Sequence, residues 1–326
     1  MSEAVRDAGT LPRYEVYGVV LATDLTLVTP LPATVAPADV VFDLVDEPLV
    51  AEEFWDGPIR QRPGDFALYR TKSIDVIRFV DEAVFFVCDD RIACMPLKPG
   101  HPIVEIRLLG GVLAYWLESR GMPTLHASAV VIDGSAVAFT AGNGGGKTSL
   151  AAELMRRGHP MLTDDILPLE LRAEGVYGLA GYPQMRMWPD EAQRFVGDLE
   201  HLTRVHPAFD KLRVPVGSPG LGSFCDAATP VAAIYLLNPV EGNHSLAFEP
   251  VPPQHRLVLL AAASFAAPVA AVAPRPERRL ETLGRLASHT PVWRLSYGRD
   301  GSDSNDVAEA VLSQLSARVR LDSGAG

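Results

Sequence analysis

The segment from Ala136 to Arg157 limits the fold of this chain more than any other part of the sequence. It contains an apolar strand, Ala136–Thr140, then a glycine-rich loop, then a helix predicted over Thr148–Arg157. Gly158 follows the helix as an end signal, and the proline two residues later prevents its continuation. A strand that leads through a tight loop into a helix is typical of layered folds, so the segment predicts an α/β structure.

The loop itself reads AGNGGGKT and matches a phosphate-binding loop (Walker A motif) in which Ala141 replaces the first glycine. Glycines let consecutive backbone N–H groups point at a phosphate, and the start of the helix adds positive charge. Lys147 can reach the β- and γ-phosphates, and the Thr148 hydroxyl can bind Mg²⁺. The alternative is a plain glycine-rich turn, but the flanking strand and helix favour binding of ATP with Mg²⁺. The expected nucleotide contacts are Asn143, Gly144, Gly145, Gly146, Lys147, Thr148 and Ser149.

Two adjacent aspartates, Asp164 and Asp165, follow a short apolar strand, Met161–Thr163. In a parallel sheet they would lie with the loop beyond the carboxyl ends of the strands, where ligand sites form. One carboxylate can hold Mg²⁺ while the other acts as a base or orients a substrate, and the residues alone leave the division open. His126, at the start of the hairpin that precedes the loop, is a further candidate, with a purely structural histidine as the alternative.

The chain has 326 residues, which at about 150 residues per domain suggests two domains. We expect a mainly β N-terminal domain over residues 1–100 and a phosphate-loop catalytic domain over residues 101–326. A helix is expected near Leu108–Leu117, and a two-residue turn at Asp133-Gly134 joins two strands. The strands predicted in the first part are Tyr14–Leu21, Val40–Val45, Phe66–Tyr69, Ile74–Val80, Ala83–Cys88 and Arg91–Met95.

Composition excludes several classes of function. A net charge of −11 argues against nucleic-acid binding and against an electrostatic membrane anchor. Three cysteines without CxxC spacing, and an N-terminus without an apolar signal region, predict a protein of the reducing cytoplasm. The apolar segment Leu257–Ala273 contains Pro268 and is expected to form a buried helix rather than a membrane span. The oligomeric state stays open, with a homo-oligomer compatible with the sequence.

Several of these segments resemble the catalytic core of the HPr serine kinase/phosphorylase family. The resemblance is carried by Leu125–Val131, the Asp133-Gly134 turn, the loop through Thr148, Arg157-Gly158-His159 and Asp164-Asp165. Looser similarity over Tyr14–Thr23, Gly181–Pro189 and Pro291–Tyr297 is typical of the HPr-kinase-related proteins of lasso-peptide biosynthetic clusters, a class of ribosomal peptide (RiPP) pathways. We find no Pro-Gly-Arg-Asn segment of the sugar-regulating enzymes, which argues against HPr as substrate and against reverse phosphorolysis.

The resemblance implies an ATP-dependent serine kinase with a P-loop-containing, HPr-kinase-like catalytic domain. It implies that Asp164 is the base, assisted by His126, and that Asp165 joins Thr148 at the metal. Lys147, at the phosphates, is the third expected catalytic residue. Three basic residues beyond this core, Arg186, Lys211 and Arg213, are expected to bind the substrate, with solvated surface cations as the alternative. The expected substrate is a precursor peptide or small protein that carries the acceptor serine. The alternatives are an HPr-type kinase, a small-molecule kinase, and a nucleotide-dependent regulatory module without phosphoryl transfer.

Overall fold

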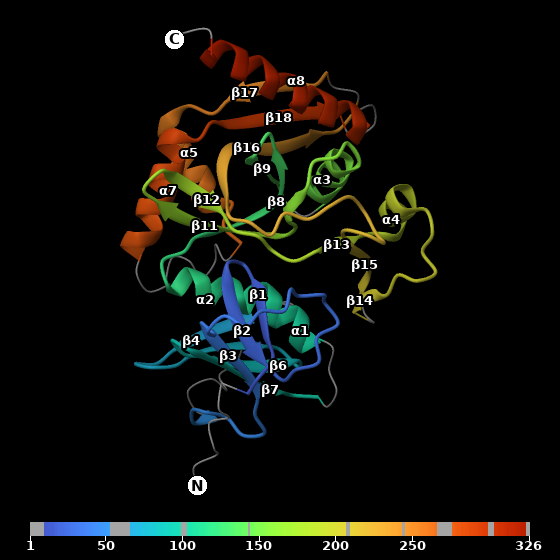
Figure 1. Ribbon diagram of the computed structural model, residues 1–326. Coiled ribbons are helices and arrows are strands. Elements are labelled where there is room, and N and C mark those ends of the chain that lie inside the picture. The colour runs from blue at the N-terminus through green and yellow to red at the C-terminus, as the bar shows by residue number, and fades with distance from the viewer. Residues whose placement is uncertain are drawn as a thin grey trace.

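The computed structural model describes residues 10–52, 66–98, 103–142, 144–206, 209–242, 245–265, 276–298 and 303–323 (Figure 1). The first part of the chain forms a seven-stranded sheet in the order β1-β2-β3-β7-β6-β5-β4. Its strands are β1 Arg13–Val16, β2 Val19–Thr23, β3 Val40–Leu44, β4 Phe66–Arg70, β5 Asp75–Phe79, β6 Ala83–Val87 and β7 Arg91–Pro96. The mainly β character predicted for this part is therefore confirmed.

One predicted strand, Tyr14–Leu21, is wrong as a single strand, because the chain reverses at Tyr17 and Gly18 to give the β1–β2 hairpin. Both turn residues have positive φ, 57° at Tyr17 and 75° at Gly18. Tyrosine rarely adopts this conformation, so the sequence gives little warning of the turn.

The helix predicted near Leu108 begins earlier and is irregular. It consists of α1 Ile103–Arg107, a π-helical segment over Leu108–Val112, and α2 Leu113–Ser119, with non-helical angles at Gly110. Its apolar side chains share one core with residues of the seven-stranded sheet. The helix thus packs on the first sheet, as Figure 1 shows. The division of the chain into domains at residue 100 stays a prediction.

The second part of the chain is built on an eight-stranded sheet. Its strands are β8 Thr124–Ile132, β9 Ser135–Thr140, β10 Met161–Thr163, β11 Ile166–Arg172, β12 Gly175–Gly178, β16 Thr229–Val240, β17 Ala247–Pro250 and β18 Val292–Gly298. Strand β8 pairs antiparallel with both β9 and β10, and β9 and β18 flank β16 in parallel. As predicted, the strands on the two sides of the glycine loop and its helix lie in one sheet.

Helices cover both faces of this sheet. They are α3 Lys147–Arg156, α5 Pro253–Ala262, α7 Pro276–His289 and α8 Ser304–Ser323. Alternation along β9 sends Phe139 into a core with α3 and α8, and Ala138 into a core with α5 and α7. The predicted α/β class is confirmed by these three layers (Figure 1).

A smaller sheet, in the order β13-β15-β14, lies beside α3. It consists of β13 Gln184–Met187, β14 Arg204–His206 and β15 Phe209–Pro215, and α4 Pro189–Val196 follows β13. Only the first part of the predicted helix Leu257–Ala273 falls on α5, and residues 266–273 lie outside the described ranges. Among the residues that the structure describes, no helix is long and apolar enough to cross a membrane.

Candidate active site

The glycine loop connects the end of β9 to the start of α3, and its conformation depends on glycine. Gly144 and Gly146 have φ of 71° and 84°. A Cβ on Gly145 would lie 2.5 Å from the Ala141 Cβ, so a larger residue does not fit there. The Nζ of Lys147 donates a hydrogen bond to the Ala141 carbonyl oxygen at 3.0 Å, which closes the loop on itself. Asn143, a predicted nucleotide contact, lies outside the described residues.

The acidic pair occupies a break between two strands that both pair with β8. Strand β10 ends at Thr163 and β11 begins at Ile166, so Asp164 and Asp165 are the only residues between them. Asp165 has a φ of 82°, an unusual conformation for a non-glycine residue that is typical of strained functional positions. The break directs the two neighbouring carboxylates toward different partners.

Asp164 is buried and is surrounded by donors. Its Oδ1 accepts hydrogen bonds from Ser128 Oγ at 2.6 Å and from Thr148 Oγ1 at 3.1 Å. Its Oδ2 accepts one from the Arg186 backbone N–H at 3.3 Å. Burial raises the pKa of Asp164 above its ordinary value, and the Ser128 hydrogen bond partly opposes this rise. The carboxylate is therefore held rigidly against the hydroxyl that begins α3.

Asp165 is more exposed than Asp164, and its carboxylate lies between the side chains of His126 and Arg186. Its Oδ1 is 3.4 Å from His126 Nδ1, and its Oδ2 is 3.8 Å from Arg186 Nη1. Burial lowers the pKa of His126, so the imidazole is mainly neutral at neutral pH. The His126 ring also packs against Phe265, with 5.4 Å between the ring centroids. Asp165 thus has a free approach from the pocket and an oriented imidazole beside it.

The contacts of the two aspartates differ from the pairing that the family resemblance implies for them. The resemblance pairs Asp165 with Thr148 at a metal, but Asp164 is the carboxylate in contact with the Thr148 hydroxyl. A hydroxyl and a carboxylate oxygen 3.1 Å apart fit a Mg²⁺ ion, which takes one or two protein oxygens and completes its shell with water and phosphate. His126 pairs with Asp165 instead of Asp164.

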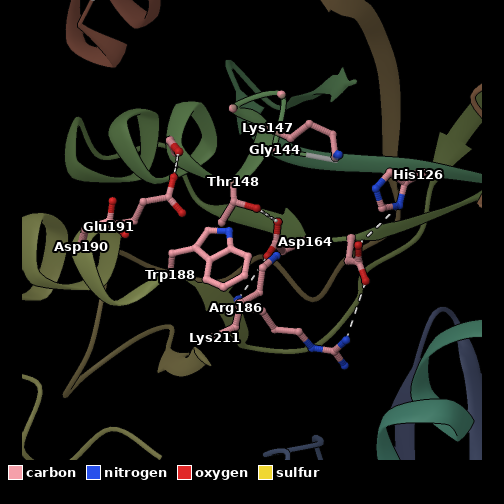
Figure 2. A pocket seen from close by; sticks show the side chains of 14 residues that line it. His126, Gly144, Lys147, Thr148, Asp164, Arg186, Trp188, Asp190, Glu191 and Lys211 are labelled. Carbon is pink, nitrogen blue, oxygen red and sulfur yellow. Dashed lines mark hydrogen bonds and ion pairs between the residues drawn. The ribbon is translucent and has the colours of Figure 1, made fainter. Parts of the chain in front are cut away.

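One pocket of about 940 Å³ collects most of the predicted residues (Figure 2). The predicted residues that line it are His126, Gly144, Gly145, Gly146, Lys147, Thr148, Ser149, Asp164, Asp165, Arg186 and Lys211. Burial lowers the pKa of Lys147, because the ammonium is partly withdrawn from water. The structure therefore brings together the loop, the acidic pair and the histidine, which are far apart in the sequence.

Arg213, which the sequence analysis places with the substrate, does not line this pocket. Its guanidinium is buried, 3.0 Å from Glu105 Oε1, and donates a hydrogen bond to Thr29 Oγ1 at 2.8 Å. Buried Glu105 requires a cation, since an unpaired buried carboxylate is costly. Arg213 thus joins β15 to α1 and to the segment after β2, whereas Lys211 on the same strand faces the pocket.

Sequence reasoning missed several residues of the pocket wall. Trp188, Asp190 and Glu191 line it, and Glu191 accepts a hydrogen bond from Ser149 Oγ. Proline after Trp188 and acidic residues in the next positions are signals of a helix start, and they locate α4 without showing what it faces. Tyr297, at the end of β18, donates a hydrogen bond to the Gly145 carbonyl oxygen at 3.2 Å.

Part of the chain is similar in sequence to known HPr kinase/phosphorylases. No protein-family model matches the chain. The chain is 35% identical over 92 residues to the HPr kinase/phosphorylase of Shouchella clausii, covering 26% of this chain and 29% of that protein. It is 34% identical over 90 residues to the HPr kinase/phosphorylase of Halalkalibacterium halodurans, covering 26% and 28%. The chain thus matches less than a third of the length of these curated relatives.

Among solved structures, the chain is similar to the HPr(Ser) kinase/phosphatase from Coxiella burnetii. The TM-score is 0.32 with 13% sequence identity, covering 61% of this chain and 98% of that one. The similarity to HPr kinases therefore rests on the sequence matches and not on this superposition. The two curated relatives bear the same name, and this chain combines the glycine loop, the acidic pair and His126 in one pocket. Over about a quarter of its length, the chain is similar to HPr kinase/phosphorylases, which supports the resemblance to the HPr-kinase-like family.

Proposed function

We propose that this protein is an ATP-dependent phosphotransferase that moves the γ-phosphoryl group of ATP to a serine hydroxyl. One observation carries the proposal: a single pocket holds a phosphate loop and two adjacent carboxylates with separate partners. A phosphoryl transferase needs one group for the metal–phosphate complex and another for the acceptor proton. A module that only binds nucleotide has no need for the second group.

At the nucleotide end, the backbone N–H groups of the loop and the start of α3 bind the phosphates of ATP. The Lys147 ammonium leaves the Ala141 carbonyl and contacts the β- and γ-phosphates. Thr148 and Asp164 are the residues that would hold Mg²⁺, which neutralises phosphate charge as transfer proceeds. Ser128 and the Arg186 backbone N–H keep the Asp164 carboxylate in place.

At the acceptor end, Asp165 is the base for the serine hydroxyl. As the serine oxygen bonds to the γ-phosphorus, the bond between that phosphorus and the β,γ-bridging oxygen breaks, and ADP leaves. The serine proton moves to Asp165, late in a loose transition state that a carboxylate can serve. His126 orients the carboxylate, and the Arg186 guanidinium lies beside it to stabilise charge on the transferred group.

For the acceptor, we propose a serine near the end of a short precursor peptide. The similarity to the HPr-kinase-related proteins of lasso-peptide clusters supports this, as does the absence of a Pro-Gly-Arg-Asn segment. A flexible end enters a recessed pocket readily, at the cost of ordering entropy, so weak affinity is expected. Arg186 and Lys211 supply positive charge at the pocket for a carboxylate-bearing end.

The test compares acceptors in an assay of ADP release with ATP and Mg²⁺. Candidate precursor peptides, purified HPr and free serine are each added to the full chain, and products are identified by mass spectrometry. Acceptor-dependent ADP release with a phosphorylated peptide serine is the expected result. Efficient labelling of HPr alone would show an HPr-type kinase, labelling of free serine would show a small-molecule kinase, and slow ATP turnover with no labelled acceptor would indicate a regulatory module.

A further inference from the structure

Trp188 is a half-exposed aromatic residue inside the pocket that holds the phosphate loop. It lies between β13 and α4, and 47% of its surface is accessible. The backbone at Trp188 is extended, and the proline that follows it occupies the first position of α4. The Nζ of Lys211 lies 5.5 Å from the centroid of the ring. A large aromatic surface left open in a functional pocket indicates a ligand with an apolar or aromatic part.

Two further carboxylates line the pocket near Trp188, in addition to Asp164 and Asp165. Asp190 and Glu191 lie on one side of the indole, and His126 lies on the far side of the pocket (Figure 2). Acidic residues in the first turn of a helix complement its dipole, which explains their place on α4 but not the open ring beside them. Because like charges repel, a triphosphate binds near Lys147 and leaves the carboxylates for an uncharged part of the ligand.

The direction of a bound nucleotide follows from the loop. Lys147 reaches the β- and γ-phosphates, and the backbone N–H groups of the loop hold the α- and β-phosphates. His126 and Asp165 mark the γ end of the pocket. The α end points past Ser149, whose hydroxyl donates a hydrogen bond to Glu191. The sugar and base that continue from the α-phosphate therefore run toward α4 and Trp188.

We propose that Trp188, Asp190 and Glu191 form the nucleoside subsite of this protein. The base stacks on the indole face of Trp188, and the two carboxylates accept hydrogen bonds from the ribose hydroxyls. The Lys211 ammonium near the ring strengthens the platform through its attraction to the aromatic face. This assignment rests on the nucleotide binding proposed above and extends it to a ribonucleotide specificity.

The test separates the nucleoside from the phosphates. Binding of ATP and of inorganic tripolyphosphate, each with Mg²⁺, is measured by calorimetry on the full chain and on Trp188→Leu. We expect the Kd for ATP to rise about tenfold, the loss of one base–aromatic stack, and the Kd for tripolyphosphate to stay unchanged. The matched variant Trp188→Phe keeps an aromatic face and restores most of the affinity for ATP.

Two results would overturn the subsite. Equal weakening of ATP and tripolyphosphate would mean that Trp188 only supports the loop. Unchanged ATP affinity with a raised KM for the acceptor would place the acceptor, and not the base, on the ring. Lys147→Ala serves as the separate control for the proposed function. If it leaves the binding of both ligands unchanged, nucleotide binding at the loop fails, whatever Trp188→Leu does.

The ribose contacts have their own readout. Wild-type protein should bind ATP more tightly than 2′-deoxyATP or 3′-deoxyATP, because a carboxylate left without its hydroxyl partner loses a charge-assisted hydrogen bond. Glu191→Gln and Asp190→Asn should reduce this preference while leaving the Kd for tripolyphosphate unchanged. Equal affinity of the wild type for ATP and both deoxy analogues would remove the two carboxylates from the subsite.

Discussion

Asp164 and Asp165 are adjacent in the chain, yet one is buried among donors and the other opens to the pocket. The difference comes from the break between β10 and β11 and from the positive φ of Asp165, which turns its side chain away from that of Asp164. Adjacent carboxylates held in separate surroundings can take separate chemical roles. The contacts with Thr148 and His126 support the metal-binding role proposed for Asp164 and the base role proposed for Asp165.

The first prediction concerns this division of roles. Asp165→Asn should lower kcat by about 10²–10⁴ at saturating Mg²⁺, since the acceptor proton loses its base. Asp164→Asn should instead raise the Mg²⁺ concentration needed for half-maximal rate, and excess metal should restore part of the activity. Metal titrations of the initial rate measure both effects. The opposite pattern would support the roles that the family resemblance implies.

The second prediction concerns pH and stability. The folded-state pKa of Asp164 is raised by burial, so its contribution to stability is full below the unfolded pKa and is lost as pH rises through the folded pKa. The Asp164→Asn variant has no titrating carboxyl group at this position, so it does not lose stability in this way as pH rises. Its amide N–H₂ group would face the Arg186 backbone N–H, and this destabilisation does not vary with pH. The Tm of the variant minus that of the wild type should therefore increase from about pH 4 to about pH 7. Parallel Tm curves would contradict a raised pKa.

The glycine loop is the element on which the proposed nucleotide binding depends. Gly146 has a φ of 84°, and a Cβ at this position would lie only 2.8 Å from the Tyr297 hydroxyl oxygen. The same hydroxyl donates to the Gly145 carbonyl. Tyr297 on β18 thus supports the loop that follows β9, although β16 lies between these two strands. A change at Gly146 or at Tyr297 should therefore weaken phosphate binding.

The third prediction is that Gly146→Ala raises the Kd for ATP about five- to thirtyfold, since a left-handed conformation costs a non-glycine residue about 1–2 kcal/mol. Adding Tyr297→Phe should recover only the steric part of the loss. Gly134→Ala is the matched control: it has a φ of 75° with nothing within 4 Å of its Cβ, in the β8–β9 turn. The control should lower Tm but leave the Kd for ATP unchanged; a loss of ATP binding in Gly134→Ala would show an effect of stability alone.

Elements with local signals could be predicted from sequence, and those that depend on distant contacts could not. The Asp133-Gly134 turn has the positive φ values that this dipeptide favours, and β9, the loop and α3 follow from glycine and helix-end signals. The β1–β2 turn was missed because Tyr17 is a poor residue for its φ of 57°. The carboxylate that accepts the Thr148 hydrogen bond depends on where β10 ends and β11 begins, and no local sequence pattern shows this.

At the scale of the whole molecule, two sets of contacts join the first sheet to the active-site region. Arg213 on β15 pairs with Glu105 on α1, which lies 108 positions away in the sequence. Tyr17, in the β1–β2 turn, packs edge-on against Tyr182 with ring centroids 6.0 Å apart, and the Tyr182 hydroxyl accepts a hydrogen bond from Arg186 Nη2 at 2.9 Å. The sequence shows that Arg186 and Arg213 are basic, but it cannot show which of the two pairs with a buried carboxylate.

The fourth prediction tests the structural role of Arg213. Arg213→Met should lower the free energy of unfolding by about 3–5 kcal/mol, because Glu105 is left buried without its cation. Arg213→Met with Glu105→Gln should lose less, and the KM for the acceptor should stay unchanged in the folded variants. Urea denaturation and steady-state kinetics provide the two measurements. A raised acceptor KM without a loss of stability would return Arg213 to the substrate site.

The central claim is that the phosphate loop and Asp165 transfer phosphate from ATP to a serine. The most direct measurement is single-turnover transfer from ATP labelled at the γ-phosphorus, with the labelled residue located by mass spectrometry, for wild type, Lys147→Ala and Asp165→Asn. We predict label on an acceptor serine with wild type, and little or none with either variant, while both variants keep the wild-type fold by circular dichroism. Label transfer that persists at the wild-type rate in Lys147→Ala would contradict the claim.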